Sequence, residues 1–222
     1  MPDLKKSKKV HVKSHERVVP ISNKNPTGIT IVDEHFRQID NLTLDSEDIY
    51  KVFQDYDKKN ITYPSKGKLK IKNSDNFDEI IAVWVDYFNQ SLKLKSQIDP
   101  DMVKALIASE STFKSDAKNK NATGLTQITL DTLKILKDQK GEAQDFTFKN
   151  INKSDLKDPM ISIALGVRWI AYKKKYADNI LKRHATPDET IQVYKGILND
   201  QSKTATLIMK KYRDYYDQLK KK

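Results

Sequence analysis

The chain has 222 residues, of which 32% are charged, and a formal net charge of +11. This length fits one domain of ordinary size with an extension, or two small domains. Because the sequence contains no cysteine, it excludes disulfides, thiolate metal sites and a cysteine nucleophile.

The excess of positive charge is spread along the chain and does not form one basic run. It favours anionic surroundings, and nucleic acid, lipid headgroups or cell-wall polymers all fit, as does an ordinary solvated surface. The first 20 residues carry no apolar signal segment, and no stretch approaches about 18 consecutive apolar residues. We therefore expect neither a signal peptide nor insertion into a membrane.

Residues 1–75 are predicted to form an N-terminal extension, either a small α/β unit or partly disordered. A polar arm over residues 1–40 shows apolar alternation only near Ile29–Val32, which predicts one short strand. A helix is predicted near 46–57 from apolar residues at helical spacing behind acidic residues. Leu69 and Ile71 alternate with lysines, which predicts an edge strand before a domain boundary near residue 75.

Residues 76–222 alternate helical patterns with polar loops, so the fold class is predicted to be mainly α. The predicted helices are 76–92, 100–111, about 126–137, 159–176, 187–195 and 202–219. Any sheet is expected to be confined to short hairpins in the loops.

The helix predicted over 100–111 has a well-marked start, because Asp99 is a natural N-cap and Pro100 fits the first helical position. One face of this helix carries three aliphatic residues followed by a carboxylate: Val103, Leu106, Ile107 and Glu110. Apolar walls disfavour a charged carboxylate, so Glu110 could keep a proton and act as a general acid. The alternative from spacing alone is that Glu110 lies at the helix end and points to water or pairs with a lysine.

Four segments, in order, resemble the soluble lytic transglycosylases of the lysozyme-like superfamily. They are Glu110-Ser111-Thr112-Phe113 closing a helix, then Ala117 and Gly124-Leu125-Thr126-Gln127-Ile128, the helix DPMISIALGVRWIAYKKKY, and IQVYKG in place of the family's Ala-Tyr-Asn-x-Gly. The resemblance covers about residues 76–217. It implies a helical, lysozyme-like SLT domain at 76–222 that needs neither a metal nor a cofactor.

The resemblance also implies the chemistry. In this family a single Glu protonates the glycosidic oxygen between MurNAc and GlcNAc in peptidoglycan, then removes the proton from the C6 hydroxyl. That hydroxyl closes on C1 and leaves a 1,6-anhydro end. Glu110 takes this position, whereas ordinary glycosidases use two carboxylates.

Other roles carry over by position. Ser111 would orient the reacting sugar, Gln127 with the backbone near Gly124 and Leu125 would line the cleft, and Tyr194 would donate its hydroxyl to Glu110. Tyr215 would also face the cleft. Phe113 and Trp169 are predicted to be core aromatics.

Two positions depart from the family pattern. Thr126 stands where Met is usual, and Lys195 stands where Asn is usual, so an amide is replaced by a cation that can only donate hydrogen bonds. Lys195 would contact an acidic group of the peptide stem or lie outside the cleft.

Several alternatives remain open. A hydrolytic muramidase would need a second carboxylate, for which Asp116 or Asp131 could serve. A non-catalytic module that binds peptidoglycan or a partner is possible, whereas a nucleic-acid binder is not expected, because no motif for one is present.

An enzyme of this class acts on the cell wall, in the periplasm or outside the cell. Without a signal peptide it would be made in the cytoplasm and delivered by a phage or a secretion machine. A delivery apparatus or an immunity protein is then an expected partner, and residues 1–75 would serve docking, delivery or regulation.

Overall fold

A computed structural model describes residues 8–12, 15–18, 29–32, 35–39, 43–119 and 121–221. The chain forms two compact units, Met1–Thr43 and Leu44–Lys222. The division lies about thirty residues before the boundary near 75 that the sequence indicated, because residues 44–75 pack with the helical unit.

In the first unit the described residues form the strands β1 (Lys8–Val12), β2 (His15–Val18), β3 (Ile29–Val32) and β4 (His35–Ile39). β1 pairs antiparallel with β4, and β2 pairs antiparallel with β3. The sequence predicted only the strand at β3. The remainder of the predicted arm lies outside the described residues.

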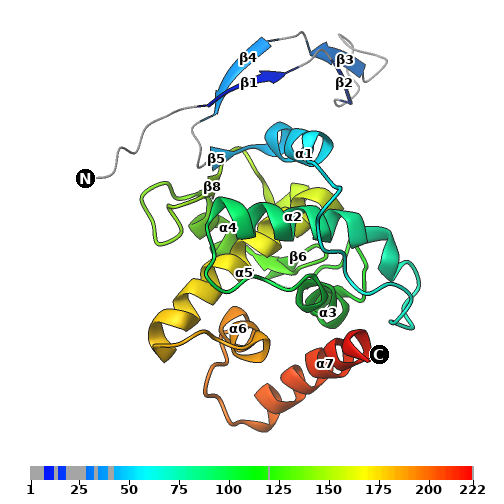
Figure 1. Cartoon of the computed structure of the whole chain (residues 1–222), viewed down its shortest axis with the longest axis vertical. Coiled ribbons are helices and arrows are strands. Elements are labelled where there is room, and N and C mark those ends of the chain that lie inside the picture. The colour runs from blue at the N-terminus through cyan, green and yellow to red at the C-terminus, as the bar shows by residue number, and fades with distance from the viewer. Residues whose placement is uncertain are drawn as a thin grey trace. The chain divides into compact units, whose positions relative to one another are not determined.

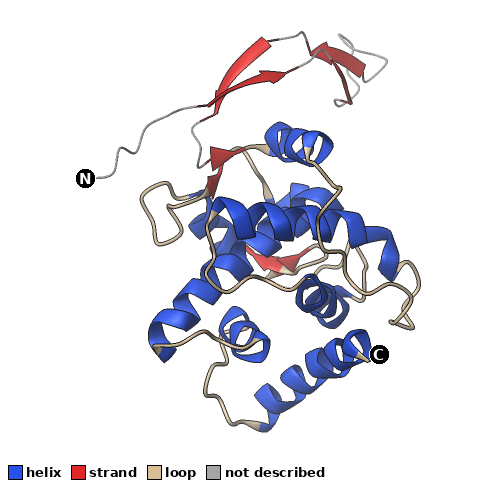
Figure 2. Ribbon diagram, in the orientation of Figure 1, coloured by secondary structure: helices blue, strands red, loops and turns tan. Residues whose placement is uncertain are grey.

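The second unit is mainly helical, as predicted, with strands of two residues only (Figure 2). Its α-helices are α1 (Ser46–Asp55), α2 (Asp78–Ser91), α3 (Pro100–Ser111), α4 (Leu130–Lys137), α5 (Pro159–Leu181), α6 (Pro187–Tyr194) and α7 (Lys203–Lys220). Two 3-10 turns, η1 (Ser74–Phe77) and η2 (Lys153–Lys157), precede α2 and α5. The short strands are β5 (Thr43–Leu44), β6 (Ala122–Thr123), β7 (Ile128–Thr129) and β8 (Thr147–Phe148).

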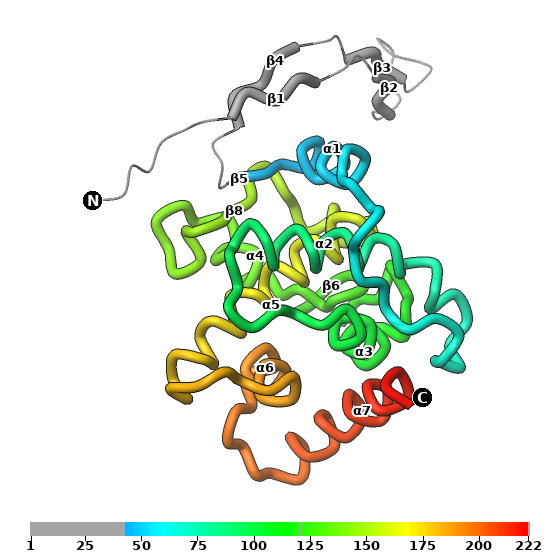
Figure 3. The backbone as a smooth tube through the Cα atoms, viewed as in Figure 1, coloured from blue at the N-terminus to red at the C-terminus, as the bar shows by residue number. Residues whose placement is uncertain are grey.

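The core lies where α2, α3 and α5 meet, and the fully buried Trp84, Phe88 and Phe146 contribute stacked and edge-to-face ring contacts there. Helix α5 packs against both α2 and α6. After α6 the chain turns back, and α7 lies beside α3 (Figures 1 and 3). This return places α7 along α3, with contacts that reach from Ser109 near the end of α3 to Asp99 at its start.

Most predicted helices are found within a few residues of their expected bounds, but two boundaries were wrong. The helix expected from about 126 begins at Leu130, because Gln127 has a left-handed φ of 50° and Ile128–Thr129 form a strand. Helix α5 continues to Leu181 and ends where Lys182 turns left-handed with a φ of 56°.

The edge strand predicted around Leu69 and Ile71 was also wrong. The described residues contain no strand there, and Leu69 is buried although it lies within an irregular loop. Lys104 on α3 forms ion pairs with two aspartates that follow this loop in the sequence. Its fully buried ammonium lies 2.6 Å from a carboxylate oxygen of Asp75 and 2.7 Å from one of Asp78. Lys104 also donates to the carbonyl of Ser65 in this loop, at 2.9 Å, so contacts with α3 hold the segment without strand pairing.

None of the helices in the described part of the chain is long and apolar enough to cross a membrane.

Candidate active site

Glu110 occupies the one position of α3 that is not buried. The other eleven residues of this helix are all buried, including the predicted apolar stripe of Val103, Leu106 and Ile107. The helix starts as expected, with the Asp99 side chain accepting from the amide of Asp101 at 3.0 Å. The helix therefore serves as a rigid, buried support that presents a single carboxylate at its C-terminal end.

Glu110 is paired with Lys195, which follows the last residue of α6. The Lys195 ammonium donates to Oε1 of Glu110 in a very close contact. The Lys195 and Glu110 side chains are only 9% and 21% exposed, so this is not an ordinary surface pair. The alternative that Glu110 pairs with a lysine is thus found in the structure, and the pair is largely buried.

Tyr194 lies in the same region but does not donate to Glu110 as predicted. Its hydroxyl donates to the backbone carbonyl of Thr126 at 2.7 Å, and a phenol has only one proton to donate. Burial, followed by the nearby charge of Glu110, raises the pKa of Tyr194 well above its usual value. The hydroxyl therefore stays protonated and ties the end of α6 to the segment 124–127.

The segment Gly124-Leu125-Thr126-Gln127 is the loop of a small hairpin formed by β6 and β7. Gly124 has a φ of 85°, and a Cβ there would lie 1.9 Å from the carbonyl oxygen of Leu156. The Gln127 amide nitrogen donates to the carbonyls of Ala117 and Gly124, at 3.0 and 2.8 Å. Gln127 therefore holds the loop that crosses beside Glu110.

Two residues of the hairpin point inward. Leu125 is fully buried, so its side chain is not available to line a cleft. Thr126 is also fully buried, and its hydroxyl donates to the carbonyl of Ser162 on α5 at 2.8 Å. A Cβ on Gly166 would lie 2.4 Å from the Thr126 methyl group. Thr126, which replaces the family's usual Met, therefore packs the hairpin against α5.

Ser111 and Tyr215, the other two predicted substrate contacts, lie on different helices. The Ser111 side chain is buried and donates to the carbonyl of Ile107 at 3.2 Å, within its own helix. Tyr215 is half-buried on α7. One turn earlier on α7, Lys211 donates to the carbonyl of Ser109 at 2.6 Å. Tyr215 therefore shares the face of α7 that lies along α3.

No local pattern pointed to Lys211, because its partner is a backbone carbonyl on a helix about a hundred residues away. Gly166 did carry a signal: a glycine inside a long helical pattern often marks a close packing contact. The two predicted core aromatics are confirmed, with Phe113 at 7% and Trp169 at 5% exposure.

The carboxylates considered for a hydrolase are both exposed. The Asp131 side chain is 88% exposed and pairs with Lys134 on the same helix, α4. Asp116 lies on an exposed turn. Neither side chain is held by buried structure as Glu110 is.

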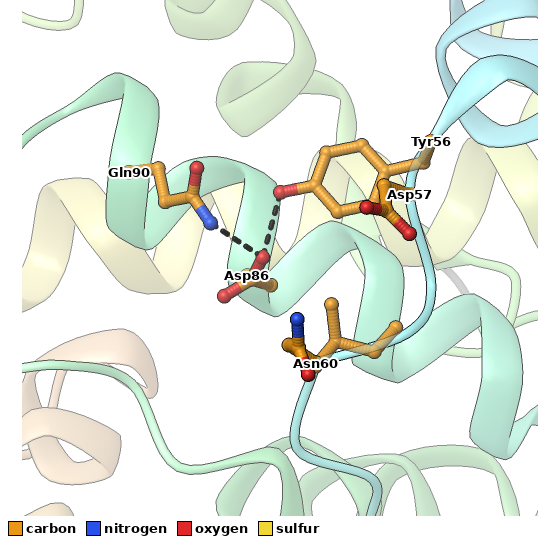
Figure 4. A pocket seen from close by; sticks show the side chains of 6 residues that line it. Tyr56, Asp57, Asn60, Asp86 and Gln90 are labelled. Atoms are coloured by element: carbon orange, nitrogen blue, oxygen red, sulfur yellow. Dashed lines mark hydrogen bonds between the residues drawn. The ribbon is translucent and has the colours of Figure 1, made fainter.

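A pocket of about 350 Å³ lies elsewhere, between the segment after α1 and helix α2 (Figure 4). Asp86 at its wall accepts hydrogen bonds from the Tyr56 hydroxyl and the Gln90 amide, both at 2.7 Å. Its lining includes none of the predicted site residues. Both of these donors bind the same carboxylate oxygen, Oδ2.

The arrangement around Glu110 brings together three of the four segments that carried the sequence resemblance: the end of α3, the hairpin and the end of α6. A search of curated proteins returned no match. A search of protein-family models returned the transglycosylase SLT domain, matched over residues 87–203, which is more than half of the chain. The chain therefore belongs to the transglycosylase SLT domain family, the lysozyme-like lytic transglycosylases whose substrate is peptidoglycan.

Proposed function

We propose that this chain is a peptidoglycan lytic transglycosylase in which Glu110 is the single acid and base. Glu110 protonates the glycosidic oxygen between MurNAc and GlcNAc and releases the leaving sugar. As a carboxylate it then takes the proton of the C6 hydroxyl, whose oxygen closes on C1. The product is a 1,6-anhydro end, and no water is consumed.

The observation that carries this proposal is the position of Glu110. It is the one residue of α3 that is not buried, and a buried helix fixes where its carboxylate lies. A general acid gains efficiency from such fixed placement, because the proton must reach one oxygen of a bound substrate. The family match over 87–203 supports the same reaction class.

The substrate contacts follow from the same region. We assign backbone groups of Gly124 and Leu125 and the amide of Gln127 to the wall of the glycan cleft. Tyr194 supports this wall through its bond to Thr126, and we keep Tyr215 as a further contact from α7.

We assign Ser111 the role of an acceptor towards the substrate. Its hydroxyl is already donated to the carbonyl of Ile107, although its oxygen can still accept. As an acceptor it could orient a sugar hydroxyl or N–H.

The matched experiment compares three proteins on purified peptidoglycan: the wild type, Glu110→Gln and Glu79→Gln. Loss of the acid should reduce fragment release by at least about 100-fold, the usual contribution of a general acid. Glu79 on α2 is 51% exposed and serves as the control for loss of one carboxylate. Equal activity of the Glu110→Gln and control variants would contradict the proposal.

One observation favours a second candidate, a non-catalytic module that binds glycan. The Glu110 carboxylate already has a partner in the Lys195 ammonium, which occupies the group that a substrate oxygen would have to reach. If this reading holds, the wild type binds peptidoglycan in a pull-down assay but releases no fragments at any pH. Release of fragments that depends on Glu110 would exclude it.

We further propose that residues 1–43 serve docking or delivery, by a phage or a secretion machine, with a delivery apparatus or an immunity protein as partner. They form a compact unit separate from the helical unit. Residues 44–75, in contrast, are built into the helical unit, where Tyr50 donates to Asp158. Deletion of residues 1–43 should therefore leave cleavage of purified peptidoglycan intact, and loss of cleavage would contradict this division.

A further inference from the structure

The ammonium of Lys195 has more hydrogen-bonding capacity than Glu110 uses. A lysine carries three N–H donors, and in the described part of the chain only the bond to Oε1 of Glu110 engages them. The Lys195 side chain is 9% exposed, so little water is available to the remaining donors. Buried polar groups are normally paired. The unused donors beside the proposed catalytic carboxylate therefore indicate a place for an acceptor from the substrate.

The position of Lys195 is fixed by the backbone around it. Its amide donates to the carbonyl of Ile191 at 2.9 Å, which closes the last turn of α6. The preceding Tyr194 anchors this turn to Thr126. The family's usual Asn could donate or accept at this position, whereas a lysine can only donate. Lys195 therefore favours carbonyl or carboxylate oxygens over groups that themselves donate.

The charges around Glu110 favour a carboxylate over a neutral acceptor. Lys211 on α7 brings a second ammonium, which binds the carbonyl of Ser109, the residue before Glu110. Among the described residues no carboxylate pairs with Lys211, and the hairpin segment 122–129 contains no ionisable side chain. Two cations thus lie with one carboxylate at the end of α3. An ammonium also binds a charged acceptor more strongly than a neutral one.

We propose that Lys195 is a specificity-determining residue that binds a carboxylate of the peptidoglycan substrate beside Glu110. The inference rests on the proposed function of Glu110. Peptidoglycan offers such a carboxylate in two places: on the peptide stem, and on the lactyl group of MurNAc where the stem has been removed. Either one accepts from the unused N–H groups of Lys195, and an ammonium between two carboxylates offsets their mutual repulsion.

The test compares native peptidoglycan with the same material after its carboxyl groups have been converted to amides. Four full-length proteins are used: the wild type, Lys195→Met, Lys195→Arg and Lys210→Met. Lys195→Met removes the ammonium and keeps an apolar stem, whereas Lys195→Arg keeps a positive donor. Lys210 is 68% exposed on α7 and pairs with Asp214, so Lys210→Met controls for the loss of one positive charge on an anionic substrate.

Rates of fragment release are measured at peptidoglycan concentrations far below saturation. Amidation should slow the wild type by about tenfold, the lower end of the coupling between close charge pairs across interfaces. Lys195→Arg and Lys210→Met should lose rate as the wild type does, whereas Lys195→Met should already be slow on native peptidoglycan and should respond little to amidation. An equal loss on amidation in the wild type and in Lys195→Met would overturn the inference.

Glycan strands stripped of their stems by an amidase distinguish the two sources of the carboxylate. If Lys195 binds the lactyl carboxylate, Lys195→Met should remain about tenfold slower than the wild type on stripped strands. If it binds a carboxylate of the stem, the two proteins should cleave stripped strands equally and differ only on strands that carry stems.

A second readout does not need activity. Co-sedimentation with native and amidated peptidoglycan is compared for Glu110→Gln and for the double variant Glu110→Gln/Lys195→Met. Amidation should weaken the binding of the first by about tenfold and change that of the second little, and an equal effect on both would overturn the inference. Full cleavage activity in Glu110→Gln would instead refute the proposed function, so the two failures are distinguishable.

Discussion

The substitution Gly124→Ala tests how the hairpin beside Glu110 is built. Gly124 has a φ of +85°, a conformation that residues with a Cβ rarely adopt. A Cβ there would also lie 1.9 Å from the Leu156 carbonyl oxygen and 2.7 Å from the Ser162 hydroxyl. The Leu156 carbonyl belongs to the backbone of η2 and cannot rotate away as a side chain can. The hairpin or η2 must therefore move.

Two costs add in this variant. A left-handed backbone costs a residue with a Cβ about 1–2 kcal/mol. Overpacking typically costs about 1–3 kcal/mol more. We therefore expect Gly124→Ala to lower the free energy of unfolding by about 2–5 kcal/mol.

Gly67→Ala is the matched control, because Gly67 also has a positive φ, +70°, but nothing lies within 4 Å of its added Cβ. It should show only the backbone cost of about 1–2 kcal/mol. Urea unfolding followed by circular dichroism gives both values, provided that the m-value stays constant. Losses in the two variants that agree within about 0.5 kcal/mol, the usual limit of additivity, would refute the packing argument.

Two further predictions concern charged groups. Lys104→Met removes a fully buried ammonium and leaves its two aspartates unpaired, so it should cost about 3–5 kcal/mol. The exposed Lys134→Met should change the same urea-derived unfolding free energy by less than about 1 kcal/mol, and similar losses in the two variants would contradict the assignment. Glu189 has its pKa lowered to about 2, mainly by hydrogen bonds from Arg183 and then from a backbone amide. Its contribution is complete above its ordinary value of 4.5 and is lost as the pH falls towards 2. The difference in stability between the wild type and Glu189→Gln should therefore shrink over that window, and a constant difference would count against the ion pair.

The helices of this protein could be predicted because their signals are local. Asp99 and Pro100 mark the start of α3, and the stripe ending in Glu110 lies on adjacent turns of one helix. The hairpin before α4 was missed because a left-handed Gln127 carries no sequence mark as a glycine would. The prediction of a strand around Leu69 was wrong. The alternation indicated correctly that Leu69 is buried, but burial alone does not specify strand pairing.

The candidate site could be predicted as a set of residues but not as a set of contacts. The sequence pointed to Glu110, Tyr194 and Lys195, and to a departure from the family pattern at Lys195. Whether Tyr194 or Lys195 bonds to Glu110 depends on how the end of α6 packs against α3, and this is a tertiary property. In the structure the Tyr194 hydroxyl donates to the carbonyl of Thr126, and Lys195 donates to the Glu110 carboxylate.

The central claim is that Glu110 drives ring closure by the sugar's own hydroxyl. Its most direct test is digestion of purified peptidoglycan in water labelled with heavy oxygen, followed by mass spectrometry of the released fragments. The account predicts fragments with anhydro ends, each lighter by one water than a reducing end, without label, and absent with Glu110→Gln. Reducing ends that carry the heavy oxygen at C1 would contradict it, because they require attack by water and hence a hydrolase.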